Sequence, residues 1–378
     1  MVKNGIINLF ADWSVILNAN ICQEKGYDVY IDNPCDQWSR KHVYGDILLY
    51  IPFVKNFSNF YFIYLPIILN LIFLYIIIDF FKFEKKISYF CLFFIVLSAP
   101  VILAIERANI DIAIFLLLIL ISKNKNILIN YLILILTTLS KFYPICMVII
   151  FLFKKKIKII LINIILFLLI VFFILFFQSE SLIKIFDNRN QFSGYGIYNF
   201  SFKGVLNLLV NFKIIVNNKS YDLVKYFCLI LLLIMPILLT IRFNFKNIFK
   251  NNSISKILNN DCFENRIYVL SSAVILFCYL SFSNFFYREI FFLGLIPWLL
   301  KNRYLIDNKF INLYFYILVS KFFFSTVFIF LVMNNVFQNF NILIIFAKYC
   351  LDFYLIAIVM IVFLIAVKNL FKRVVLNT

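Results

Sequence analysis

Hydrophobic runs separated by short polar segments make up most of this chain. The runs fall at residues 57–81, 87–104, 108–122, 127–153, 159–177, 222–243, 266–282, 290–300, 310–333 and 343–367. A helix needs about 20 apolar residues to cross a bilayer, so the long runs predict transmembrane helices and the short ones predict tilted, broken or re-entrant helices. The pattern therefore predicts an all-α polytopic membrane protein, a bundle of about 10–12 transmembrane or re-entrant helices.

The run 127–153 predicts a break instead of a single span. It is bounded by the basic segments KNKN and KKKIK, and its middle reads TLSKFYP, with Lys141 and Pro144 inside the apolar stretch. Proline removes a backbone donor from a helix and disfavours the helical conformation of the residue before it. We therefore expect two short helices that meet near residues 141–144 and return to the side where they began.

Basic residues gather between the apolar runs. The clusters are Lys82/Lys85/Lys86, Lys123/Lys125, Lys154/Lys155/Lys156/Lys158, Arg242/Lys246/Lys250/Lys256, Lys301/Arg303/Lys309 and Lys368/Lys372/Arg373. All of them fall on one side if the runs alternate and the 127–153 hairpin returns, and this side is expected to be cytoplasmic. The other side then receives residues 1–56, the short turn 105–108, the loop 178–221 and the turns 283–289 and 334–342.

Composition excludes an ordinary soluble protein. The 378 residues are 64% hydrophobic and 14% charged, whereas a soluble domain has about 45–50% and about 25%. The basic residues that give the net charge of +18 lie between apolar runs. We therefore expect them to set the membrane topology and to contact anionic membrane lipids, and we expect no nucleic-acid partner. We expect one integral-membrane domain over 1–378. Its parts are an external catalytic-type loop over 1–56, a first helix group over 57–177, the external loop 178–221 and a second helix group over 222–378.

The N-terminal polar segment contains candidate chemistry. Asp12 stands beside Trp13 in an apolar context, where a carboxylate is partly desolvated. Cys22 and Cys35 are expected to form a disulfide if the loop faces an oxidising periplasm; two free thiols are the alternative. The only histidine, His42, has no partner at ligand spacing, so no metal site is expected. Since no hydrophobic segment precedes Asp12, either a first helix lies upstream of Met1 or residues 1–20 form an interfacial helix.

Three charges interrupt the apolar stretch LSAPVILAIERANIDIAIFLLLILIS. Glu106, Arg107 and Asp111 are costly at bilayer depth and therefore require an explanation. One interpretation is structural: Arg107 and Asp111 are four residues apart and can pair on one helical face. The other is functional: the three charges form the polar floor of a cavity for a lipid headgroup. Both interpretations stay open from the sequence.

Other charges inside apolar runs divide into two kinds. Lys141 has no carboxylate three or four residues away and sits at a predicted break, and Arg288 lies at an external turn, so both are candidates for phosphate binding. Lys348 and Asp352 are spaced for a structural ion pair within one helix. Lys321 is isolated in the sequence.

The order of these features resembles the GT-C superfamily of integral-membrane glycosyltransferases, especially bacterial members that depend on polyprenyl-phosphate-mannose. Four segments carry the resemblance: Asp12-Trp13 followed by KGYDVYIDNP, the Pro-to-polar turn SAPVILAIERANID, the break TTLSKFYPICMVIIFLFKKK, and YNFSFKGVLNLLV after the next helix. Together they span roughly the first 210 residues. ERAN stands where the family more often has a turn containing Gly and Gln, and the C-terminal third matches loosely.

The resemblance implies a transferase that moves a hexose, such as mannose, from a polyprenyl-phosphate-linked donor to a glycolipid or glycan acceptor. Asp12 would accept the proton of the acceptor hydroxyl. Lys141, Arg288 and Arg107 would stabilise the phosphate, with Glu106 and Asp111 as further polar residues of the cavity. No cofactor is expected, and the protein would lie in the bacterial inner membrane with its site facing the periplasm. A transporter or flippase, or a polymerase, for lipid-linked glycans is the alternative.

Overall fold

The computed structural model describes residues 9–82, 86–153, 157–190, 199–211, 230, 234, 260–281, 286–305, 309–333 and 341–376. The run predicted over 222–243 and the turn 334–342 lie almost wholly outside the described residues. The described elements are α1 (Ala11–Gln23), η1 (Asp46–Tyr50), η2 (Phe60–Tyr64), α2 (Leu65–Phe80), α3 (Lys86–Val96), α4 (Ala99–Arg107), α5 (Ile110–Lys123), α6 (Ile127–Ser140), η3 (Tyr143–Phe153), α7 (Ile157–Phe177), α8 (Ser179–Asn190), α9 (Phe202–Asn211), α13 (Phe263–Ser281), η4 (Phe286–Leu295), α14 (Ile296–Leu305), α15 (Lys309–Met333) and α16 (Asn341–Leu376).

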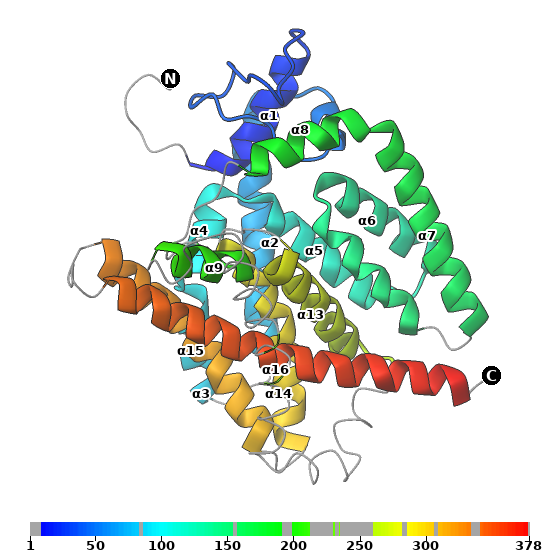
Figure 1. The fold of residues 1–378 in the computed structure, drawn as a ribbon, viewed down its shortest axis with the longest axis vertical. Coiled ribbons are helices and arrows are strands. Elements are labelled where there is room, and N and C mark those ends of the chain that lie inside the picture. The colour runs from blue at the N-terminus through cyan, green and yellow to red at the C-terminus, as the bar shows by residue number, and fades with distance from the viewer. Residues whose placement is uncertain are drawn as a thin grey trace.

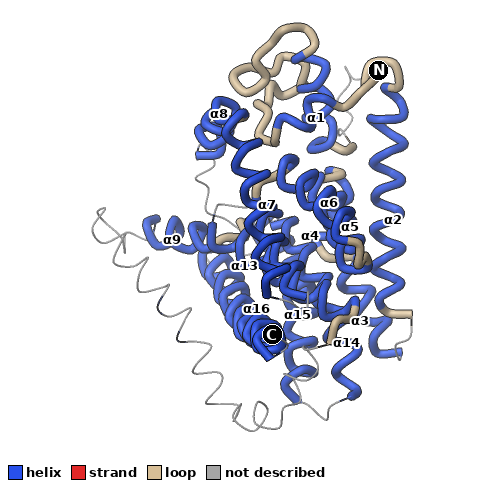
Figure 2. The backbone as a smooth tube through the Cα atoms, turned by 90° about the vertical axis from the view of Figure 1, so that its right-hand side faces the viewer, coloured by secondary structure: helices blue, strands red, loops and turns tan. Residues whose placement is uncertain are grey.

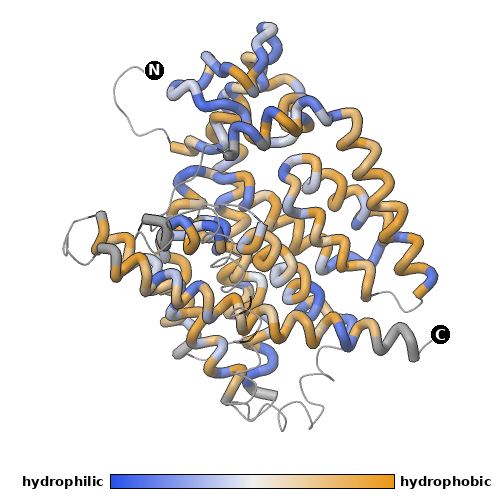
Figure 3. Tube along the Cα trace, viewed as in Figure 1, coloured by the Kyte–Doolittle hydropathy of each residue, from blue (hydrophilic) through white to orange (hydrophobic). Residues whose placement is uncertain are grey.

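Helices form most of the described part of the molecule (Figure 1). Five described helices are long and apolar enough to cross a membrane: Phe60–Phe80, Ile157–Phe177, Phe263–Ser281, Phe310–Val332 and Leu343–Phe371. A sixth candidate is a pair of helices that meet at a 50° bend, Tyr89–Val96 and Ala99–Arg107. The helices are apolar along most of their length (Figure 3), and many of their large apolar side chains are exposed, which fits contact with lipid. The predicted all-α, multi-pass fold class is therefore confirmed.

The helix α13 lies at the centre of the packing. It contacts α5, η3, η4 and α16, and its buried side chains join the main hydrophobic cluster. The elements α2 and α7 contribute fewer buried residues; α2 lies at one edge of the molecule in Figure 2, and α7 lies at one edge in Figure 1. This arrangement places the first turn of α5, the start of η3 and the start of η4 within reach of one another.

The predicted break in the run 127–153 is present. The helix α6 ends at Ser140, Lys141 is extended, and η3 begins at Tyr143. The carbonyl of Thr137 accepts the last helical hydrogen bond from the Lys141 N–H. Two short helices meeting at this point were predicted, and they are observed.

A second break separates α4 from α5. Ala108 adopts a left-handed backbone conformation with φ of 43°, and Asn109 caps the next helix by accepting a hydrogen bond from the Asp111 N–H at 3.0 Å. The turn therefore divides the ERANID segment: Arg107 ends one helix and Asp111 begins the other.

Residues 9–56 form a cap at one end of the molecule, beside α8 and away from α14 (Figures 1 and 2). The predicted polar loop thus contains a helix, α1, whose side chains are largely buried. The loop predicted over 178–221 is also partly helical, because α8 and α9 fall within it. The amide of Asn188 in α8 donates to the Tyr30 carbonyl at 2.7 Å, and Lys184 pairs with Asp28 at 2.8 Å, which fixes α8 to the cap.

Candidate functional site

Asp12 lies in the first turn of α1, where the cap meets the α4–α5 break. Its Oδ2 accepts a hydrogen bond from the Asn109 amide at 2.7 Å. Its Oδ1 lies 3.6 Å from a guanidinium nitrogen of Arg107 and 3.8 Å from one of Arg40. The Trp13 indole N–H donates to the Tyr61 carbonyl at 2.8 Å, which anchors this end of α1. A carboxylate is therefore held between two arginines at the base of the cap.

Asp111 is the anionic centre of the buried part of the site. The Lys141 ammonium donates to its Oδ1 at 2.5 Å, and the Tyr143 hydroxyl donates to the same oxygen at 2.7 Å. The Arg288 Nε lies 3.5 Å from Oδ2. The Arg288 guanidinium also stacks over the Tyr143 ring at 4.9 Å. Three elements, α5, η3 and η4, thus meet at one carboxylate.

Asn109 connects the two parts. Its amide nitrogen donates to Asp12, while its amide oxygen accepts from Lys141 at 3.3 Å. We call the connected residues the site network: Asp12, Arg40, Arg107, Asn109, Asp111, Lys141, Tyr143 and Arg288. The sequence-predicted residues Asp12, Arg107, Lys141 and Arg288, which span 277 positions, all belong to this network.

Exposure falls steadily along the site network. The side chains of Arg107 and Arg40 are 33% and 29% exposed, Asp12 and Arg288 are each 11% exposed, and Lys141 and Asp111 are 2% and 0% exposed. A ligand arriving from the surface would therefore meet the arginines and Asp12 first. Lys141 and Asp111 form a buried ion pair behind them.

The structure changes the interpretation of three predicted residues. The structural alternative of an Arg107–Asp111 pair on one helical face is not what the structure shows. The helix breaks at Ala108 and Asn109, so Arg107 pairs with Asp12 and Asp111 pairs with Lys141. Asp111 was expected to line a cavity, but it is fully buried within ion pairs. Glu106 is exposed, and its backbone carbonyl accepts a hydrogen bond from the Phe10 N–H of the cap at 2.8 Å.

The backbone of the cap directly contacts the break between α6 and η3. The Gly45 N–H donates to the Ser140 carbonyl at 3.1 Å, and a side chain at Gly45 would collide with the Leu139 carbonyl. The ring of the preceding residue, Tyr44, has its centroid 5.2 Å from the Lys141 ammonium. This close approach requires glycine and brings the cap onto the buried ion pair.

Arg40 is a member of the network that the sequence reasoning missed. Its guanidinium donates to the Asp36 carboxylate through Nε at 3.0 Å and Nη2 at 2.9 Å, and Nη2 also donates to the Ala11 carbonyl at 3.0 Å. Burial raises the pKa of Asp36, but hydrogen bonds from Arg40 outweigh burial and hold that pKa below its usual value. The only sequence signal was the four-residue spacing of Asp36 and Arg40.

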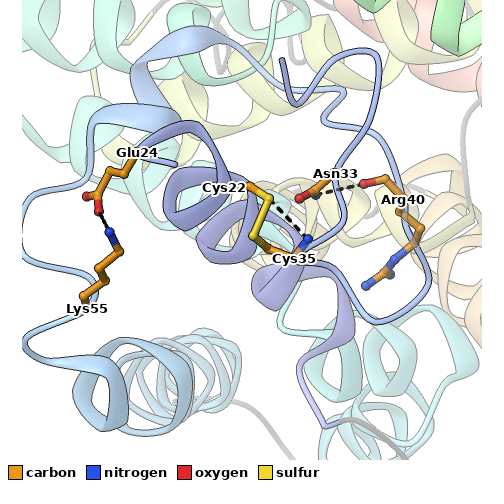
Figure 4. Close-up of a disulfide and its surroundings, with 6 residues drawn as sticks. All are labelled: Cys22, Glu24, Asn33, Cys35, Arg40 and Lys55. Carbon is orange, nitrogen blue, oxygen red and sulfur yellow. Dashed lines mark hydrogen bonds and ion pairs between the residues drawn. A yellow bond between two sulfur atoms is a disulfide. The ribbon is translucent and has the colours of Figure 1, made fainter. Parts of the chain in front are cut away.

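Cys22 and Cys35 are joined in a disulfide that ties the end of α1 to the loop before Asp36 (Figure 4). The same view shows the Asn33 amide donating to the Arg40 carbonyl at 3.0 Å. His42 is buried between Tyr30 and Tyr44, with ring centroids 5.3 and 5.5 Å away, and burial lowers its pKa to about 3. In the part of the chain that the structure describes, no group of three or more His, Cys, Asp and Glu residues could hold a metal ion.

A second charge cluster lies deeper, between η4, α15 and α16. Lys321 pairs with Glu289 at 2.9 Å and Asp352 at 2.5 Å, and Lys348 pairs with Asp352 at 2.8 Å. We call Glu289, Lys321, Lys348 and Asp352 the quartet. The predicted Lys348–Asp352 ion pair is confirmed, whereas Lys321 is not isolated. Glu289 and Arg288 were placed in an external turn, but they lie in η4 and face different clusters.

Comparison with models of protein families, with curated proteins and with solved structures finds no match to this chain.

Proposed function

We propose that this protein is a membrane glycosyltransferase of the GT-C type. It would move a hexose, such as mannose, from polyprenyl phosphate to a glycan or glycolipid acceptor. The observation that supports this most directly is the position of Asp12, a largely buried carboxylate held beside the partly exposed Arg40 and Arg107 in a network with four cations. The positive charges outnumber the negative ones, since three carboxylates face the four cations. The carboxylates are Asp12, Asp36 and Asp111, and the cations are Arg40, Arg107, Lys141 and Arg288. A partly exposed site with excess positive charge suits an anionic donor beside a proton acceptor.

The exposure gradient assigns different roles to the predicted phosphate-binding residues. Arg107 is the cation that an entering phosphate reaches first, and an arginine fork can bind phosphate through two hydrogen bonds. Lys141 and Arg288 already neutralise the charge of Asp111 in the buried part of the network, so the proposal gives them no direct contact with the phosphate. Their part in the proposal is to hold Asn109 and the α4–α5 turn in place, and through them Asp12.

The proposed reaction is a direct displacement. The bond between the sugar C1 and the donor phosphate oxygen breaks, and the phosphate keeps the electron pair. The acceptor hydroxyl oxygen forms the new bond to C1, and its proton passes to Asp12. Arg107 stabilises the charge retained on the phosphate. Asp12 Oδ2 is positioned for this role by the Asn109 amide.

The proposal places the cap on the periplasmic face of a bacterial inner membrane. A disulfide in the cap suits an oxidising compartment. Two of the predicted basic clusters meet the start of α13 at another place: Lys123 lies over the Phe263 ring, and Lys301 pairs with Glu264. They lie a full length of α5 from Asn109, as the positive-inside rule expects.

The test is transfer of radiolabelled hexose from polyprenyl phosphate by purified protein in vesicles, starting with mannose and a pool of membrane glycolipid acceptors. Asp12→Asn should lower the transfer rate by about 10²–10⁴-fold, because the proton acceptor is lost. Asp32→Asn, at an exposed cap carboxylate, is the matched control and should keep full activity. Both variants should melt at the wild-type temperature.

Two results would contradict the proposal. Wild-type transfer by Asp12→Asn would remove Asp12 as the proton acceptor. Passage of intact labelled lipid across the vesicle, without any sugar transfer, would favour the transporter or flippase, and growth of a long glycan on its carrier would favour the polymerase.

A further inference from the structure

The Arg40 guanidinium is held by the cap itself through all three of its nitrogens. Its Nε and Nη2 donate to the Asp36 carboxylate, Nη2 also donates to the Ala11 carbonyl at 3.0 Å, and Nη1 lies 3.8 Å from the Asp12 Oδ1. Its plane lies over the Trp38 ring, 4.4 Å from the centroid. With its donors used inside the protein, Arg40 is poorly suited to bind an incoming phosphate. It can instead fix the position of the groups that it touches.

The segment that carries Arg40 is fixed in turn by a disulfide and by Asp36. The disulfide to Cys22 holds Cys35, the residue before Asp36 (Figure 4). The Asp36 carboxylate accepts hydrogen bonds from the backbone N–H groups of Trp38 at 3.1 Å and Arg40 at 3.0 Å, in addition to those from the guanidinium. Asp36, which is 3% exposed, therefore links Arg40 to the residue that carries the covalent bond.

The segment 35–40 runs from one end of α1 to the other. Cys22 lies in the last turn of α1, whereas Ala11 and Asp12 lie in its first turn. At 1.5 Å per residue these two ends are about 16 Å apart. The disulfide anchors the segment at the first of these ends, and Arg40 binds the second. We call Cys22, Cys35, Asp36 and Arg40 the clasp.

We propose that the clasp positions Asp12 for proton transfer, with Arg40 as a positioning residue and the disulfide as the bond that keeps Arg40 in place. This inference rests on the proposed function. Arg40 holds the Asp12 carboxylate through Oδ1, and the Asn109 amide holds it through Oδ2 at 2.7 Å. Catalysis is sensitive to such placement, because a displacement of about 1 Å can lower a rate by about 10²-fold. Breaking the disulfide should therefore slow sugar transfer, although both sulfur atoms lie at the far end of α1.

Positioning and mere stabilisation by the disulfide have different kinetic consequences. A disulfide that only stabilises the fold would leave the kcat of reduced, still folded enzyme at the wild-type value. A clasp that positions Asp12 would instead lower the kcat of that enzyme. The donor KM would stay unchanged, because the cation proposed to receive the phosphate, Arg107, lies on α4, outside the clasp.

Arg40→Gln tests the positioning residue. Its kcat should fall by roughly 10–100-fold with both KM values unchanged. Asp36→Asn releases the same guanidinium and should cause a similar loss, and the double variant should lose no more than either single one, because the two residues act as a unit. Lys41→Gln removes the next positive charge along the chain and is the control, with wild-type kcat. Wild-type kcat in Arg40→Gln, or losses that multiply in the double variant, would overturn the clasp.

Reduction of the folded enzyme tests the disulfide. Wild-type protein treated with dithiothreitol, with Cys22 and Cys35 identified as free thiols by mass spectrometry, should lose kcat as Arg40→Gln does. Reduction of Arg40→Gln should then cause no further loss. The double variant Cys22→Ser with Cys35→Ser has no disulfide to break, so it controls for other effects of the reductant and should not respond. Unchanged kcat of the reduced wild-type protein, assayed below its melting temperature, would overturn the clasp.

Hydrogen exchange reports on the clasp without any sugar transfer. The first two turns of α1 should exchange faster in the reduced protein and in Arg40→Gln, with α16 unchanged. The two proposals can therefore fail separately. Unchanged kcat after reduction, with Asp12→Asn inactive, would reject the clasp and leave the transferase standing. Faster exchange in a protein that transfers no sugar from any donor would reject the transferase and leave the clasp as a fixed support for α1.

Discussion

The site network and the quartet are both charge clusters in an apolar protein, and they are built differently. The quartet has two lysines and two carboxylates, with side chains no more than 2% exposed. The site network has more cations than carboxylates and opens gradually to the surface through Arg107 and Arg40. Balanced, sealed charges satisfy each other, whereas an unbalanced cluster at a surface can still bind an anion. This contrast favours a structural role for the quartet and supports the proposal that the network binds an anionic ligand.

Breaking the quartet should have the largest effect on stability. Lys321→Met leaves Glu289 and Asp352 without their shared cation, and an uncompensated buried charge costs about 3–5 kcal/mol. The measurement is thermal or denaturant unfolding in detergent. The double variant Lys321→Met with Asp352→Leu keeps the Glu289–Lys348 pair and should recover part of the loss. Wild-type stability of the single variant would show that the quartet is not structural.

Removing Arg107 should affect activity and spare stability. Arg107→Gln deletes a partly exposed cation that the proposal places on the phosphate, so transfer should fall by about 10²-fold, with the free energy of unfolding within about 0.5 kcal/mol of wild type. The control is Lys184→Gln, at a cation of α8 with similar exposure that pairs with Asp28 of the cap. Unfolding of Arg107→Gln as severe as that of Lys321→Met would erase the distinction between the clusters.

Lowering the pH should destabilise the cap and leave the stability of the quartet unchanged. The folded-state pKa of His42 is about 3, below the ordinary value of 6.5, because of burial. Below pH 6.5 the His42 imidazole of the unfolded chain becomes protonated, whereas that of the folded cap stays neutral down to about pH 3. The free energy of unfolding of the cap therefore falls as the pH is lowered through this range, by at most about 1.4 kcal/mol per pH unit. Hydrogen exchange, corrected for its intrinsic pH dependence, should show faster opening of the cap at pH 5 than at pH 7, with α15 and α16 unchanged.

The matched variant for this effect is His42→Phe, which keeps an aromatic ring between Tyr30 and Tyr44. It should remove the dependence of cap opening on pH between 5 and 7. The same acid response with and without the histidine would assign the effect to other groups.

Local patterns predicted local features of this fold. The apolar runs predicted the helices, TLSKFYP predicted the break at Lys141, and the four-residue spacing predicted the Lys348–Asp352 pair. Each of these depends on residues close together in the chain. The same rule failed for Arg107 and Asp111, because it assumes one continuous helix and Ala108 ends that helix.

The pairings across the fold could not be obtained this way. Lys141 meets Asp111 from 30 positions away, and Lys321 meets Glu289 from 32. Nothing in one sequence says which of several buried lysines faces which carboxylate, because tertiary packing decides it. Arg40 was missed for the same reason: its contact with Asp12 depends on how the cap folds back over α1.

The adjacency of Arg288 and Glu289 limits how this chain can vary in length. In a 3₁₀ helix successive side chains point about 120° apart, so the two neighbours on η4 serve Asp111 and Lys321 in separate directions. Inserting or deleting one residue of η4 just before Arg288 would rotate both side chains. The Arg288 guanidinium would then point away from the Asp111 carboxylate, and Lys321 would lose the Glu289 carboxylate. We expect sequence variation here to occur by substitution, with insertions and deletions confined to segments outside η4.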